Sequence, residues 1–133
     1  MRPLAGMAAS ALLAQAPAAA AQEEALRLPS GPEARLFEVL TNRPSGGGLI
    51  YRFRYVADGF TAGAERFDAI SGDLAWLCET HALPRISNIG PQPVQVIVSL
   101  ADRESEFGVY DETVTQVFEA YRIENDRCIW EMF

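Results

Sequence analysis

The sequence contains no lysine, a single histidine (His81) and only two cysteines. Its eleven basic residues are therefore all arginine, against eighteen aspartate and glutamate residues, which gives a formal net charge of −7. Binding to nucleic acid or to an anionic membrane requires clustered positive charge, so this composition argues against both. The lack of lysine also excludes a Walker phosphate loop at Gly46–Gly48. We expect no cofactor, and we interpret the glycine run as a hairpin loop.

Apolar residues dominate the start of the chain. Arg2 follows the first methionine, no charge occurs from Leu4 to Leu13, and a run of small residues ends at Ala21. These are the three parts of a cleavable secretory signal, so we predict a signal peptide over residues 1–21. No later segment approaches the roughly 20 apolar residues that a membrane span needs. The alanine-rich signal and the use of arginine alone indicate a GC-rich bacterial source, which would make the compartment the periplasm.

The two cysteines, Cys78 and Cys128, are most simply explained as one disulfide, because an exported protein meets an oxidising compartment. A bridge between them would close a loop of about 50 residues and stabilise the domain by about 4 kcal/mol in the chain-entropy model. A metal pair or a redox-active thiol is the alternative. Both commonly use close C-x-x-C spacing, which is not found here, and we expect no metal.

The first half of the expected domain begins with a tether and a hairpin. Residues 22–33 form a polar leader whose prolines and glycine predict a loop. Ala34–Leu40 and Leu49–Val56 have the alternating patterns of strands, joined through the glycine-rich loop. Along the second strand, aromatic residues that should meet the core alternate with arginines: Tyr51, Phe53 and Tyr55 on one face, Arg52 and Arg54 on the other.

A short strand, a helix and a central strand are expected next. Glu65–Ile70 fits a short strand, and Ser71 is a plausible N-cap for the helix that follows it. That helix would stop before Pro84 and present an apolar stripe to the core, consisting of Leu74, Leu77, Cys78 and His81. Val94–Leu100 is the most β-rich run in the chain and predicts a central strand.

The C-terminal segment predicts a hairpin with a defined register. A two-residue turn at Asn125-Asp126 would place Glu124 opposite Arg127, and the same register pairs Ile123 with Cys128, Tyr121 with Trp130 and Glu119 with Met132. If this hairpin packs on the helix, the disulfide would connect helix and sheet. The expected fold class is α+β, a single domain over residues 34–133 with an antiparallel sheet of four to six strands and one main helix.

Three segments carry a resemblance to a known family. They are Leu77–Arg85, Val98–Arg103 with Phe107-Gly108, and Glu119–Ile123 continued by Cys128–Glu131. On these residues the chain resembles an uncharacterised family of small exported alphaproteobacterial proteins, a domain of unknown function, over most of its mature length. The resemblance implies no catalytic residues. Some members carry the label of acetolactate synthase, but thiamine-diphosphate enzymes of that kind are cytoplasmic and several times longer, so the sequence contradicts that label.

Four residues are candidates for binding. Arg52 and Arg54 stand about 7 Å apart on one strand face and could hold an anionic group, although cross-strand pairing with Glu38 explains them equally well. Asp102 and Arg103 directly follow the central strand, in a loop, and loops at such positions often carry functional residues. Asp102 with Glu104 could serve in acid-base hydrolysis, but a solvated turn is the commoner explanation of such a pair.

The single histidine limits the catalytic possibilities. Any Ser-His-Asp mechanism would run through His81, whose place near the end of a helix instead suits packing or capping, with the imidazolium favoured by the helix dipole. A zinc site would need carboxylates recruited from elsewhere. We name no catalytic residue. Tyr110, Trp130 and Phe133 could form an aromatic contact surface, with a core position preferred for Trp130.

Three classes of function are consistent with these observations. The first is a non-catalytic periplasmic interaction or accessory protein that docks on a larger envelope complex. The second is a small-ligand binding protein, which would need a concave pocket with converging polar groups. The third is a small hydrolase acting through His81 or Asp102.

Overall fold

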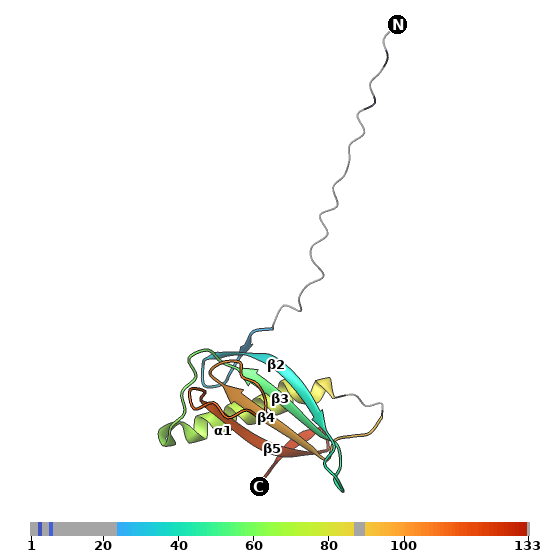
Figure 1. Ribbon diagram of the computed structural model, residues 1–133, viewed down its shortest axis with the longest axis vertical. Helices are drawn as coiled ribbons and strands as arrows, with labels where there is room; N and C mark the ends of the chain where they lie inside the picture. The colour runs from blue at the N-terminus through green and yellow to red at the C-terminus, as the bar shows by residue number, and fades with distance from the viewer. Residues whose placement is uncertain (1–2, 4–5, 7–23, 87–89, 133) are drawn as a thin grey trace.

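A mixed six-stranded sheet, curved into a half-barrel, carries one helical segment across one of its faces (Figure 1). The computed structural model describes residues 24–86 and 90–132, together with Pro3 and Gly6. The strands lie side by side in the order of the chain. They are β1 (Leu26–Arg27), β2 (Glu33–Asn42), β3 (Ile50–Val56), β4 (Gln95–Ala101), β5 (Gln116–Glu124) and β6 (Arg127–Glu131). The predicted signal peptide lies outside the described residues, apart from Pro3 and Gly6.

The strands expected at Ala34–Leu40 and Leu49–Val56 are confirmed as β2 and β3, which pair antiparallel. The aromatic face of β3 meets the core as predicted, since Phe53 and Tyr55 are almost fully buried. The glycine-rich run connects the two strands and packs closely on the start of β4. A Cβ atom at Gly48 would lie 2.4 Å from a side-chain methyl group of Val94, so a residue with a side chain at this position would require Val94 to shift.

The helical segment is longer than the sequence predicted. It runs through η1 (Ala64–Arg66), α1 (Phe67–Leu77), η2 (Cys78–Ala82, a π-helical turn) and η3 (Leu83–Arg85). The strand expected at Glu65–Ile70 is therefore wrong, and Ser71 lies inside α1 rather than capping it. The physical reason is the apolar stripe, which begins at Ile70 and continues through Leu74 and Leu77, all buried.

Pro84 does not end this segment, as the sequence analysis expected. It lies in the first turn of η3, where a backbone N–H would have no partner within the helix, so proline is tolerated there. The chain becomes extended at Ile86, the C-cap of η3.

The sheet is not purely antiparallel, which corrects the expected fold class. β3 and β4 run parallel, with Phe53 beside Val98 and Tyr55 beside Leu100. The helical segment carries the chain back along the sheet, so β4 starts at the same end as β3. All other neighbouring strands pair antiparallel. β4 is central, between β3 and β5, as predicted.

The C-terminal hairpin has the predicted register. Asn125 and Asp126 have positive φ angles of 53° and 59°, the backbone that a two-residue turn of this type requires. The ladder pairs Glu124 with Arg127, Ile123 with Cys128 and Tyr121 with Trp130. It ends at Ala120 and Glu131, so the expected pair of Glu119 and Met132 is not part of it.

The disulfide between Cys78 and Cys128 is present and joins the start of η2 to β6. The Cα atoms are 6.2 Å apart. Both predicted parts of this feature, the pairing and the connection of helix to sheet, are confirmed.

The polar leader is part of the folded sheet rather than a tether. β1 pairs with β2, and Leu26 and Leu28 are buried in the core. Ser30 then donates hydrogen bonds from its amide and hydroxyl to the carboxylate of Asp73, a buried residue of α1. These two leucines and this buried polar contact give the segment its fixed position, which the loop-like composition of the leader did not reveal.

In the part of the chain that the structure describes, no helix combines the length and the apolar character needed to cross a bilayer.

Candidate functional site

The four predicted binding residues lie on or beside the sheet face away from the helix. Arg54 is only 4% exposed. Its guanidinium donates hydrogen bonds to Glu38 on β2 and to the backbone carbonyl and hydroxyl of Ser105. The predicted cross-strand pair of Glu38 and Arg54 is therefore confirmed, with a buried arginine and a carboxylate that is 32% exposed. Arg54 binds its own chain through these contacts.

Arg52 is held differently. Its guanidinium carbon lies 4.7 Å from the centre of the Phe107 ring, a cation–π contact. Arg54 also stacks on Phe107, at 5.6 Å, and on Phe37, at 5.4 Å. The two arginines are thus covered by the segment that follows β4.

That segment leaves β4 at Asp102 and returns to β5 at Thr115. Asp102 closes its base, because its carboxylate accepts a hydrogen bond from the Thr115 amide while its own amide donates to the Thr115 carbonyl. The neighbouring guanidinium of Arg103 lies 3.2 Å from the other carboxylate oxygen. The hydrogen bond from Arg103, and then that from Thr115, lowers the pKa of Asp102 below its ordinary value.

The carboxylates suggested for acid-base hydrolysis have separate partners. Asp102 contacts Arg103 and Thr115, whereas Glu104 forms an ion pair with Arg35 at 3.3 Å. Arg103 itself is more than half exposed. The structure therefore brings Arg52 and Arg54 together under one loop, with Asp102 and Arg103 at its base.

Sequence reasoning missed the residues that complete this face. Ser99 lies beside Arg54 in the β3–β4 register and is 1% exposed. Among the described residues, neither the Ser99 hydroxyl nor the Nε atom of Arg54 has a hydrogen-bond partner. Ser105 and Phe107 come from the loop, and only its fold across the sheet brings them to the arginines. A cavity of about 500 Å³ opens beside them, lined by Phe37, Glu38, Leu40 and residues 104–107.

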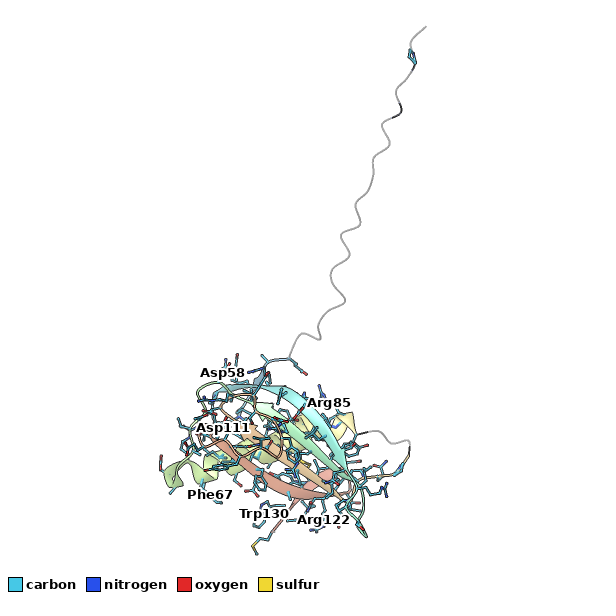
Figure 2. The ribbon with its side chains drawn as sticks, in the orientation of Figure 1. Asp58, Phe67, Arg85, Asp111, Arg122 and Trp130 are labelled. Carbon is cyan, nitrogen blue, oxygen red and sulfur yellow. A yellow bond between two sulfur atoms is a disulfide. The ribbon has the colours of Figure 1, made fainter. Side chains whose placement is uncertain are left out.

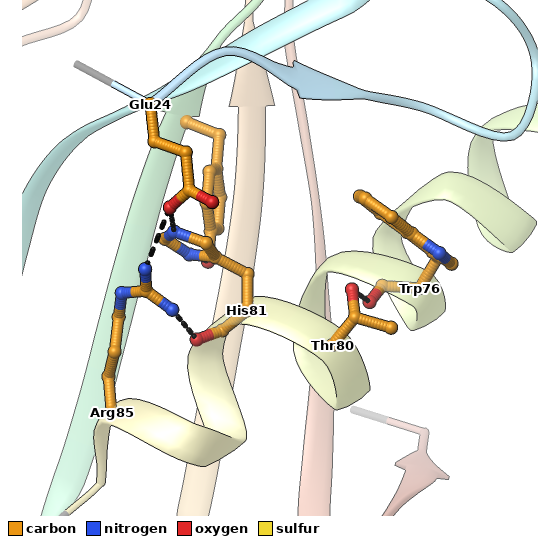
Figure 3. A network of polar contacts seen from close by, with 6 residues as sticks. Glu24, Trp76, Thr80, His81 and Arg85 are labelled. Atoms are coloured by element: carbon orange, nitrogen blue, oxygen red, sulfur yellow. Dashed lines mark hydrogen bonds and ion pairs between the residues drawn. The ribbon is translucent and has the colours of Figure 1, made fainter. Parts of the chain in front are cut away.

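His81 lies at the centre of a second polar network, which ties the start of the described domain to the helical segment (Figure 3). Its Nδ1 atom is 2.8 Å from the Tyr55 hydroxyl, and its Nε2 atom is 3.6 Å from the Glu24 carboxylate. Arg85 contacts the same carboxylate at 3.0 Å and donates to the His81 carbonyl at 2.8 Å. Next to His81, the Thr80 hydroxyl donates a hydrogen bond to the Trp76 carbonyl, one helical turn earlier.

The environment of His81 favours the neutral imidazole. Burial is the main cause that lowers the His81 pKa, and Arg85 lowers it further, while Glu24 acts in the opposite direction. The expected stabilisation of an imidazolium by the helix dipole is therefore outweighed. A neutral His81 ring whose Nδ1 atom accepts a hydrogen bond from the Tyr55 hydroxyl carries its proton on Nε2, toward Glu24.

The Tyr55, His81 and Glu24 arrangement has the connectivity of a catalytic triad but not its chemistry. A triad nucleophile must be reachable by substrate and easily deprotonated. Tyr55 is 1% exposed, and burial raises the pKa of its phenol well above the ordinary value. The arrangement is suited to packing, as the sequence analysis preferred for His81. Among the described residues there is no group of three or more His, Cys, Asp or Glu side chains placed to hold a metal ion.

An apolar groove of about 280 Å³ lies between the first half of α1 and the start of β5. Phe67 of α1, labelled in Figure 2, lines the groove, and its side chain is 62% exposed. Phe118 also borders the groove, but its register places its side chain beside Ser99, on the sheet face away from the helix. The lining residues are Ala62, Gly63, Phe67, Ile70, Ser71, Leu74 and residues 116–119. Exposed aromatic side chains next to a concavity are a common feature of binding surfaces.

The predicted aromatic surface is only partly described. Trp130 is 53% exposed, which corrects the expected core position. It lies on the last strand of the sheet, where its indole N–H donates to the carboxylate of Glu119, one of the groove residues. Tyr110 is 90% exposed on the loop after β4, and Phe133 lies outside the described residues.

The model of a family described as a family of unknown function (DUF6497) matches residues 8–133 of the chain. The chain belongs to this family. The match covers nearly the whole sequence, so the DUF6497 unit includes the sheet, the helical segment and both surfaces described above. No curated protein and no solved structure matches the chain.

Proposed function

We propose that this DUF6497 protein is a non-catalytic interaction protein of the bacterial periplasm, which docks on a larger envelope component through the groove between α1 and β5. The observation that carries the proposal is the groove itself, an apolar concavity beside a phenylalanine that is 62% exposed. Such a side chain costs free energy in water, and a partner that buries it would recover that cost.

Export is part of the same proposal. The predicted signal peptide over residues 1–21 would deliver the chain to the periplasm, and an alphaproteobacterial origin agrees with its alanine- and arginine-rich composition. The disulfide is consistent with an oxidising compartment.

The contacts of the other candidate residues favour the groove over the alternatives. A small-ligand site at the arginines would have to displace Glu38 and Ser105 from Arg54. A hydrolase would need Asp102 or His81 to act, yet these side chains bind Thr115 and Tyr55.

The proposal can be tested by site-specific photo-cross-linking in the producing cells. A benzophenone amino acid would replace Phe67 or the exposed Ala62 at the groove, and Phe107 on the other sheet face as a control with an exposure similar to that of Phe67. We expect one envelope protein to be cross-linked from both groove positions and not from Phe107. Cross-links from Phe107 alone, or none from the groove, would reject the groove as the docking site.

A further inference from the structure

We infer that the groove between α1 and β5 recognises a polypeptide segment in which one large apolar side chain is flanked by basic residues. This inference rests on the proposed function, because it specifies the partner for the same surface. It is carried by the size of the groove and by the charge at its rim.

The groove fits an anchoring side chain rather than a whole small molecule. Its floor includes Ile70 and Leu74, which are buried, and its wall includes Val117. The volume of about 280 Å³ is at the lower limit of the range of about 300–1,000 Å³ that is usual for ligand pockets, so little space remains beyond one large side chain. A segment that inserts one apolar side chain and lies across the rim would use the space and also cover Phe67.

Two carboxylates stand at the rim. Glu119 lines the groove directly. The oxygens of Glu65 lie 2.6 and 2.7 Å from the position that a Cβ atom would take on Gly63, so this carboxylate lies beside a lining residue, at the edge of the groove, without lining the groove itself. Neither carboxylate forms an ion pair with any residue that the structure describes, although Glu119 accepts a hydrogen bond from Trp130.

Uncompensated negative charge around an apolar floor selects for positive charge around an apolar anchor. The formal net charge of −7 acts in the same direction over longer distances, because it attracts cationic partners and repels acidic ones, including a second copy of this chain. An acidic or purely apolar segment would leave both rim carboxylates without a counter-charge.

A phage-displayed library of random 12-residue peptides, selected on the purified protein, tests this directly. We expect the enriched peptides to contain an aromatic residue or leucine with arginine or lysine within a few positions. The enrichment should be lost on Phe67→Ser and kept on Val94→Ser. Both change an exposed apolar residue, and Val94 precedes β4 at the opposite end of the sheet from the groove.

The affinity for the best enriched peptide then shows how much the two rim carboxylates contribute to binding. We expect the double variant Glu65→Gln/Glu119→Gln to bind it roughly tenfold more weakly, and the affinity of the unmodified protein to fall as salt rises. The control Glu124→Gln/Asp126→Asn removes the same charge at the hairpin turn, about 17 Å along the strand from Glu119, and should bind as the unmodified protein does.

The outcomes separate the inference from the proposed function. Peptides that depend on Phe67 but lack basic residues, or that bind both double variants equally, would overturn the inference and leave the docking groove in place. Self-association of the protein through Phe67, or binding of a detergent-like amphiphile at Phe67, would likewise overturn the inference and leave the docking groove in place. If no peptide is enriched and no cross-link forms from the groove, both proposals fail.

Discussion

Arg54 and Ser99 are neighbours on β3 and β4, and each carries a buried polar atom without a hydrogen-bond partner among the described residues. Burying a polar atom without a partner costs free energy, whereas removing that atom costs little. The two serines that flank Arg54 therefore differ. Ser105 accepts a hydrogen bond from its guanidinium, and Ser99 does not.

A comparison of two alanine variants tests this difference. We expect Ser99→Ala to leave the free energy of unfolding unchanged or to raise it by up to about 1 kcal/mol, because it removes an unpartnered hydroxyl. Ser105→Ala should lower it by about 1 kcal/mol, because it removes an acceptor of a charged donor. Urea unfolding of both variants provides the measurement. Equal losses in the two variants would show that the Ser99 hydroxyl has a partner.

His81 predicts a pH dependence of stability. Its folded-state pKa is lowered, mainly by burial, from the ordinary value of about 6.5 in the unfolded chain. Between these two values the unfolded state binds more protons. The stability contributed by the neutral ring is therefore complete above about pH 7 and is lost as the pH falls from 6.5 through the folded-state pKa.

The measurement is simple because the chain has one histidine, so its ring gives a single set of NMR signals. We expect His81 to titrate below pH 6.5, and His81→Gln to show a flatter loss of stability between pH 7 and 5. Glu24→Gln should lower the His81 pKa further, since the Glu24 carboxylate raises it. A folded-state value at or above 6.5 would contradict this account.

At the residue scale the sequence predicted partners on neighbouring strands but not contacts made by loops. The pair of Glu38 and Arg54 could be expected because cross-strand neighbours follow from strand register. Ser105 and Phe107 reach the arginines only because the segment after β4 folds back across the sheet. Local patterns contain no information on that path, since it depends on contacts between residues about 50 positions apart.

At the scale of elements, the disulfide is the covalent connection between the helical segment and β6. β6 is the last strand of the sheet and pairs with β5 alone. Glu79, next to Cys78, also accepts a hydrogen bond from the Cys128 amide, so the two elements meet at this point. The bridge closes a loop across a sequence separation of 50 residues.

Reduction of this disulfide should lower the free energy of unfolding by about 4 kcal/mol, the chain-entropy value for a loop of this length. We expect the amides of β6 to show the largest increase in hydrogen exchange, because without the bridge that strand is held mainly by its pairing with β5 and by side-chain contacts such as that of Glu79 with the Cys128 amide. Denaturant unfolding with and without dithiothreitol gives the loss. The variant Cys78→Ala/Cys128→Ala is the control and should not respond to the reductant. A loss below about 1 kcal/mol would contradict the assigned role.

The elements differ in how far the sequence could predict them. The register of the last hairpin followed from two turn residues, because a two-residue turn fixes every pair beyond it. The segment Glu65–Ile70 was misread because six residues satisfy a strand pattern, while its helical stripe becomes visible only when Leu74 and Leu77 are counted with Ile70. The parallel pairing of β3 and β4 depends on the direction in which the helical segment returns, which no local pattern specifies.

At the scale of the whole molecule, the sheet has two differently covered faces. The helical segment packs on one face (Figure 1). The segment between β4 and β5 covers arginines on the other face. The groove opens beside the first half of α1, where the helix meets the start of β5. Binding in the groove can therefore leave the arginine cluster and the disulfide unchanged.

The proposed export and the disulfide make one joint prediction about the molecule in its cell. If residues 1–21 direct export, the protein recovered from producing cells should begin at Gln22, reside in the periplasmic fraction and contain no thiol that reacts with N-ethylmaleimide. A variant without residues 2–21 would stay in the reducing cytoplasm. Its Cys78 and Cys128 should both react with N-ethylmaleimide, and it should unfold at a lower denaturant concentration than the exported form. This difference should equal the decrease that dithiothreitol produces in the exported form. Oxidation of the purified cytoplasmic variant should restore the difference, which separates the effect of the bridge from any effect of the leader. Recovery of the unprocessed chain from the cytosol with two free thiols would reject export, and with it the proposed role in the envelope.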